Sequence, residues 1–174
     1  MATAEGREMS ENSCMTSESA VPLLTLDRWI PVPRQTLWRC WIEPELLKQW
    51  FCPKPWRVTH AEMELRVGGS SLVVMQGPEG EEVPNRGVYL DVVGGRRLVF
   101  TDAFVRAWVP SGKAFMVATI TFADEAGDDG VRGTRYRAEV AHWTGEDRAQ
   151  HEAMGFHQGW GIATDQLAEL AGRL

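Results

Sequence analysis

The chain has 174 residues, of which 44% are hydrophobic and 24% are charged, which suits one well-packed globular domain. A formal net charge of −6 gives no electrostatic basis for binding nucleic acid or anionic lipid. The three cysteines form no CxxC pair, and no apolar run is long enough for a signal peptide or a membrane span. We therefore expect a cytoplasmic protein without a metal, a cofactor or a nucleic-acid partner.

The N-terminal part divides into a tail and the start of a domain. Residues 1–22 are rich in Ser, Thr, Glu and Met and contain no aromatic residue, so we predict a disordered tail there and a domain at 23–174. The first strand is expected at 23–30, before a Pro-Val-Pro turn. Two short helices follow, at 34–41 and 45–50. The first places Leu37, Trp38 and Trp41 on one face, because they are three to four residues apart.

A long β region occupies the middle of the chain. We predict strands at 56–67, 70–75, 88–93, 97–104, 115–122 and 134–143, separated by glycine-rich turns. In the last strand Tyr136, Ala138, Val140 and His142 alternate with charged residues, so they should face the core.

The C-terminal region is predicted to be helical. Thr144 is a candidate N-cap, and an apolar stripe with helical spacing then runs to Ala171, which predicts one long amphipathic helix. Gly155, Gly159 and Gly161 interrupt this stripe, and we attribute them to close approach of another element. The order of elements predicts an α+β fold with about six to seven antiparallel strands around the last helix.

No strong catalytic signature is present, and we assign no catalytic residue. The sequence contains no nucleophile elbow and no phosphate loop. His151 and His157 are six residues apart and do not share a helix face, so they do not predict a metal site. For His142 three roles remain open: a hydrogen-bonded residue at the edge of the core, a ligand contact, or a base. We expect Cys40 to be buried and Cys52, beside a proline, to be more exposed.

Aromatic and methionine side chains gather on the elements that should enclose the sheet interior. Small molecules typically bind in apolar pockets that carry a few polar groups. We therefore predict a ligand-binding set formed by Trp50, Trp56, Phe104, Met116, Tyr136, His142, Met154, Phe156 and Trp160.

Several short motifs, taken in order and spacing, match one superfamily. They include 33–41, then PELLKQWF at 44–51, ELRVGG at 64–69, RLVFTD at 97–102 and HEAMGF at 151–156. From about Leu26 to Leu174 the chain resembles START-like (SRPBCC) ligand-binding domains, and within them bacterial proteins grouped with the activator of a heat-shock protein ATPase. The resemblance implies a helix-grip fold, with a cavity between the sheet and the C-terminal helix. Ser71 stands where such proteins often carry an aromatic residue, which would widen that cavity.

Three functions follow as hypotheses. The first is binding of an apolar or amphipathic small molecule in the cavity, by a monomer or a homodimer. The second is an enzyme of the cyclase, dehydratase or hydrolase type in the same cavity, with His142, Tyr136 and Asp102 as candidates. The third is a co-chaperone-like module that binds a protein through the outer face of the sheet.

Overall fold

The computed structural model describes residues 20–174, so most of the predicted tail lies outside the described residues. The elements in chain order are β1 (Leu23–Ile30), α1 (Arg34–Ile42), α2 (Pro44–Leu47), β2 (Arg57–Met63), β3 (Ser70–Gln76), β4 (Glu82–Val93), β5 (Arg97–Thr101), β6 (Phe104–Arg106), β7 (Val109–Pro110), β8 (Met116–Ala126), β9 (Arg132–His142), α3 (Gly145–Ala153) and α4 (Phe156–Ala171).

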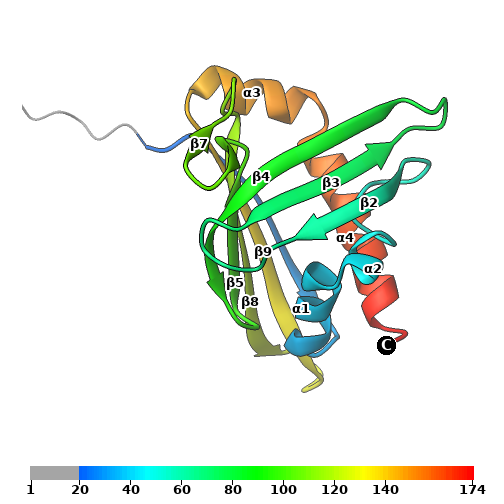
Figure 1. Ribbon diagram of the computed structural model, residues 1–174. Helices are drawn as coiled ribbons and strands as arrows, with labels where there is room; N and C mark the ends of the chain where they lie inside the picture. The colour runs from blue at the N-terminus through cyan, green and yellow to red at the C-terminus, as the bar shows by residue number, and fades with distance from the viewer. Residues whose placement is uncertain (1–19) are drawn as a thin grey trace, which may run out of the picture.

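Seven strands form one antiparallel sheet in the order β1-β9-β8-β5-β4-β3-β2, and β6 and β7 form a separate small hairpin. Figure 1 shows the sheet curving around α4, with α1 and α2 near one end and α3 at the other. This arrangement is the predicted α+β helix-grip fold, with two short helices after the first strand.

The alternation in β9 gives the sheet its buried face. Tyr136, Ala138, Val140 and His142 are buried, as predicted, while the residues between them are more exposed. The buried face continues across both neighbouring strands, since Ala138 pairs with Leu26 of β1 and with Ile120 of β8. Because the side-chain period of a strand is two residues, this register places the whole apolar set on the inner side.

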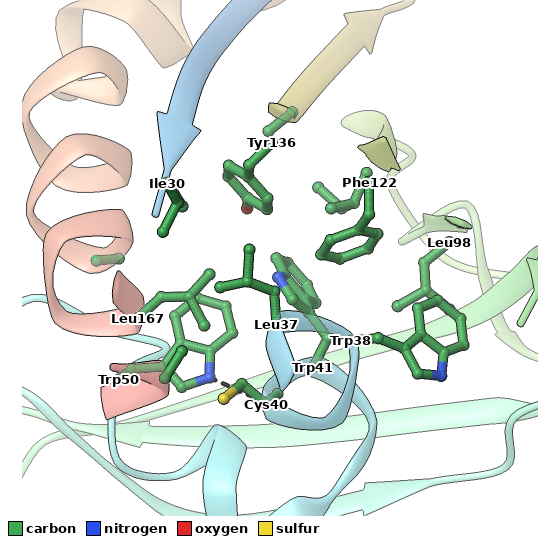
Figure 2. Packing of buried hydrophobic residues seen from close by; sticks show 14 of the residues in the cluster. Ile30, Leu37, Trp38, Cys40, Trp41, Trp50, Leu98, Phe122, Tyr136 and Leu167 are labelled. Carbon is green, nitrogen blue, oxygen red and sulfur yellow. Dashed lines mark hydrogen bonds between the residues drawn. The ribbon is translucent and has the colours of Figure 1, made fainter. Parts of the chain in front are cut away.

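Helix α1 supplies the centre of the core. Its buried residues are Leu37, Trp38, Cys40 and Trp41. The indole Nε1 of Trp50 donates a hydrogen bond to the carbonyl oxygen of Cys40 at 3.0 Å, which joins the segment after α2 to α1 (Figure 2). The rings of Trp41 and Trp50 meet edge to face, with centroids 4.9 Å apart, so the short helices pack as one unit.

The C-terminal helical region differs from the prediction, because it is two helices rather than one. Gly155 separates α3 from α4 in the left-handed conformation, with a φ of 92°, which stops a right-handed helix. Close approach does not explain the other two glycines. A Cβ at Gly159 would lie 3.9 Å from Pro53, and one at Gly161 would lie 3.6 Å from Arg28, which are ordinary contacts.

Three local predictions were also wrong. The strand expected at 97–104 ends at Thr101, and Phe104 begins the β6–β7 hairpin instead. The strand expected at 56–67 ends at Met63. Cys52 is buried, because Gln166 of α4 donates from Nε2 to the carbonyl oxygens of Trp50 and Cys52, both at 2.9 Å, and draws this loop against the helix.

Candidate functional site

A cleft of about 550 Å³ lies between the inner face of the sheet and α4. Residues from β3, β4, β5, β8, β9, α1 and the loop after α2 line it together with α4. Its apolar wall is made largely of aromatic and methionine side chains, namely Trp41, Phe51, Phe100, Met116, Phe156 and Trp160. The cleft opens to solvent, since Met154 at its edge is 71% exposed.

Most of the predicted ligand-binding residues lie at this cleft. Those that line it are Trp50, Met116, Tyr136, Met154, Phe156 and Trp160. Their positions follow from two patterns visible in the sequence, the alternation of the strands and the helical spacing of the C-terminal region.

Three predicted residues do not line the cleft. Trp56 packs against a smaller core cluster that contains Val58. Phe104 lies in the β6–β7 hairpin and meets the ring of Trp108 edge to face, with centroids 5.7 Å apart. His142 is buried beside His151, and it is His151 that lines the cleft.

Trp41, Tyr136 and Thr164 carry polar groups of the cleft that are almost fully buried, at 4%, 1% and 3% exposed. Thr101 is buried as well, at 1% exposed, and its hydroxyl is already bonded within the chain. Figure 2 shows the indole nitrogen of Trp41 facing the hydroxyl of Tyr136. Burial raises the pKa of the Tyr136 phenol, and the neighbouring Trp41 and Thr164 side chains, which favour the ionised form, oppose this rise. Tyr136 is therefore a neutral phenol at physiological pH.

A second polar pair lies on the β3–β4 side, where Ser71 lines the cleft next to Tyr89. Burial raises the pKa of Tyr89 to about 12, and the hydrogen bond with Ser71 offsets part of the increase. Ser71 shares its strand face with Val73 and Met75, which also line the cleft, as the alternation of β3 predicts.

Two histidines lie together near the open side of the cleft. The Nε2 of His142 and the Nδ1 of His151 are 3.0 Å apart, at hydrogen-bond distance, and the rings of Phe115 and Phe156 pack against His151. Burial lowers the pKa of His151, and the neighbouring His142 adds to this effect. Nothing in the sequence spacing indicated this pair, because it joins a strand to a helix.

Asp102 has a structural role at the edge of the cleft. Its Oδ1 accepts hydrogen bonds from the backbone N–H groups of Phe115 at 2.9 Å and Met116 at 3.0 Å, which fixes the start of β8. The adjacent Thr101 donates from its hydroxyl to the carbonyl oxygen of Met116 at 2.8 Å. One oxygen of this carboxylate is therefore already occupied by backbone donors.

The sequence prediction missed several residues of the cleft. Trp41, Phe51 and Phe100 were not in the predicted ligand-binding set, since the spacing of aromatic residues is the same for a packed core and for a cleft wall. Thr164 belonged to the predicted helical stripe, and its small polar side chain among apolar neighbours was the available signal. Within residues 20–174, no group of three His, Cys, Asp or Glu side chains is placed to hold a metal ion. None of the described helices is long and apolar enough to cross a membrane.

Comparison with known proteins places the chain in one family. A crystal structure from Nitrosomonas europaea is 42% identical, with a TM-score of 0.79, and the match covers 87% of this chain and 94% of that one. Two further structures share the fold. One, from Mycobacterium smegmatis, is 24% identical with a TM-score of 0.69, and the match covers 86% of this chain and 90% of that one. The other, from Staphylococcus epidermidis, is 22% identical with a TM-score of 0.71, and the match covers 91% of this chain and 94% of that one. No curated protein matches the sequence. The model of the family described as "Activator of Hsp90 ATPase homolog 1-like protein" matches residues 31–172, so the chain belongs to that family and has its START-like fold.

Proposed function

We propose that this protein binds an apolar or amphipathic small molecule in the cleft between the sheet and α4. The observation that supports this function is the cleft itself, with a volume of about 550 Å³ and walls of aromatic and methionine side chains. Sites for small molecules typically have volumes of about 300–1,000 Å³, with mostly apolar walls and a few polar groups that orient the ligand. Trp41, Ser71 and Tyr136, which line the cleft, supply such polar groups here.

An enzyme in the same cleft has less support. Asp102 accepts two backbone hydrogen bonds, and His142 is bonded to His151 rather than exposed to the cleft. General acid–base catalysis requires a titratable group within reach of the reacting atom. Asp102 and His142 are instead engaged in holding β8 and α3.

The co-chaperone hypothesis takes its partner from the family's description, which refers to an activator of the Hsp90 ATPase. That role requires a protein-contact surface rather than a cleft of small-molecule size. A pull-down from a cell extract that recovers this chaperone, with a cleft that binds no small molecule, would favour it over our proposal.

Binding is tested by NMR chemical-shift perturbation with three ligand classes: long-chain lipids, polyketide-like aromatic compounds and flavonoids. We expect at least one class to shift the signals of Trp41, Met116 and Trp160, which lie in the cleft wall. If no class shifts these signals, the proposal is wrong.

A matched pair of variants on β3 locates the binding site. Ser71→Phe places a ring in the cleft and should weaken binding at least about tenfold, which corresponds to about 1.4 kcal/mol. Leu72→Phe adds a ring on the opposite face of the same strand and should leave affinity unchanged. Equal effects of both substitutions would contradict binding in the cleft.

A further inference from the structure

Three of the buried polar groups of the cleft offer hydrogen-bond donors, which indicates what kind of polar group the ligand carries. The groups belong to Trp41 of α1, Tyr136 of β9 and Thr164 of α4, and their role in binding rests on the proposed function. An indole N–H can only donate, whereas each hydroxyl can donate and accept. The three elements therefore bring together two hydroxyl groups and one obligatory donor.

That obligatory donor lacks a well-aligned acceptor among the described residues. The Nε1 of Trp41 is buried and makes no hydrogen bond of good geometry within residues 20–174. Leaving a buried donor unpaired costs about 1–3 kcal/mol, so such a group in a native structure calls for an acceptor from outside the chain. The indole N–H faces the phenol oxygen of Tyr136, so an acceptor atom that approaches this pair can bond to both (Figure 2).

The surroundings determine the charge of that acceptor. The charged or titratable side chains Arg86, Asp102 and His151 that line the cleft are all more exposed than Trp41 and Tyr136. Of the described residues that line the cleft, only Arg86 and His151 can carry a positive charge, and neither is as buried as these donors. A carboxylate placed there would lose its hydration without gaining an ion pair, which is costly, whereas a neutral oxygen would not.

We propose that the ligand is a neutral carbonyl compound with an aromatic body, whose carbonyl oxygen accepts hydrogen bonds from Trp41 and Tyr136. The aromatic body is favoured by the rings that wall the cleft, among them Phe51, Phe100 and Trp160. Aromatic rings stack or meet edge to face with such walls and gain energy beyond simple burial.

The test compares three rigid probes that share one tricyclic ring system: fluorene, fluorenone and fluorene carboxylate. Their binding to the wild-type protein is measured by isothermal titration calorimetry. Fluorenone adds a carbonyl oxygen to fluorene, and the carboxylate adds a charge. A net gain from hydrogen bonding of about 1 kcal/mol predicts that fluorenone binds about fivefold tighter than fluorene. The carboxylate should bind more weakly than fluorenone.

Two conservative variants identify the donors. Tyr136→Phe removes only the phenol oxygen and should reduce the preference for fluorenone over fluorene without abolishing it, because Trp41 can still donate, while fluorene binding is retained. Thr119→Val removes a hydroxyl on the outer face of β8, at a residue that does not line the cleft, and should leave the preference intact. The infrared carbonyl band of bound fluorenone should lie at lower frequency in the wild type than in Tyr136→Phe.

The outcomes separate this inference from the proposed function. If fluorene and fluorenone bind equally to the wild type, the cleft binds apolar molecules and the carbonyl inference is wrong. If the carboxylate binds best, the ligand is an anion and the inference is also wrong. If none of the three binds, the carbonyl inference is wrong, while the proposed function is decided by the separate NMR test with lipids, aromatic compounds and flavonoids. The comparison of probes uses the wild type alone, so it remains decisive if a variant fails to fold.

Discussion

At the scale of single residues, Trp50 joins two parts of the core. Its ring packs against Trp41, and its N–H donates to the Cys40 carbonyl oxygen inside the protein. Trp50→Phe removes this hydrogen bond and part of the ring, and it leaves a buried carbonyl without a partner. We expect the free energy of unfolding to fall by about 2–4 kcal/mol, measured by urea denaturation.

The matched control is Trp143→Phe, because Trp143 is 52% exposed. Substitutions at exposed positions usually change stability by no more than about 0.5 kcal/mol. Similar losses for the two variants would mean that Trp50 stabilises the fold no more than a surface tryptophan does.

At the same scale, the sequence predicted which side chains face inward but not which of them reach the cleft. Tyr136 and Phe156 were identified because strand and helix periodicity determine their direction. His142 was assigned to the cleft on the same pattern, yet it is the neighbouring His151 that lines the cleft. A contact between elements far apart in the sequence depends on their packing, which periodicity does not determine.

At the scale of elements, replacing Gly155 or Gly159 by alanine should change the stability of the protein in opposite directions. Gly155 has a φ of 92°, a region that an alanine adopts only with strain, so Gly155→Ala should destabilise the protein by about 1–2 kcal/mol. Gly159 lies inside α4, where a Cβ would meet only Pro53 at 3.9 Å. Gly159→Ala should therefore stabilise the protein by about 0.5–1 kcal/mol.

Each glycine variant is the other's control, because both add one methyl group to the same helical region. Thermal unfolding followed by circular dichroism at 222 nm, a wavelength that reports helix content in general, gives both signs in one assay. A lower Tm for Gly159→Ala together with a higher Tm for Gly155→Ala would indicate one continuous helix instead of α3 and α4.

The same comparison explains why the sequence predicted one long helix. The apolar spacing continues across Gly155, and a glycine inside a helical pattern is compatible with both a helix interior and a helix end. The conformation of Gly155 is determined by how α3 packs against β1 and β9, which includes the bond from Arg148 Nε to the Leu23 carbonyl oxygen. Tertiary contacts of this kind are not encoded in local spacing.

At the scale of the whole molecule, the succession of elements along the chain could be predicted from turn signals and alternation, and the helix-grip architecture from family resemblance. The predicted strand count of about six to seven was confirmed by the seven-stranded sheet. The exact shape of the cleft could not be predicted, because it depends on the rotamers of Trp41 and Phe100 and on the loop held by Gln166. A change in the rotamer of one lining side chain alters the volume of the cleft, although the sequence pattern stays the same.

The stability of the molecule should depend on pH through His151. Burial and the neighbouring His142 lower the pKa of folded His151 below its ordinary value, so the unfolded chain binds this proton more tightly. Above the unfolded pKa of about 6.5, both states are neutral and the residue adds no pH dependence. As the pH falls through that value, the unfolded state is protonated first, and the free energy of unfolding should decrease until folded His151 is protonated as well.

Urea denaturation between pH 8 and pH 5, with an NMR titration of the His151 ring, measures both quantities. His151→Gln should lose less unfolding free energy between pH 8 and pH 5 than the wild type does, because the titrating group is gone. Arg148 and Glu152 of the same helix keep their mutual ion pair in this variant. Because α3 is held partly by the bond between the two histidines, protonation should also speed amide exchange in α3 before it affects α4. A His151 pKa at or above 6.5 in the folded protein, or an unchanged slope in His151→Gln, would show that this pair does not link pH to stability.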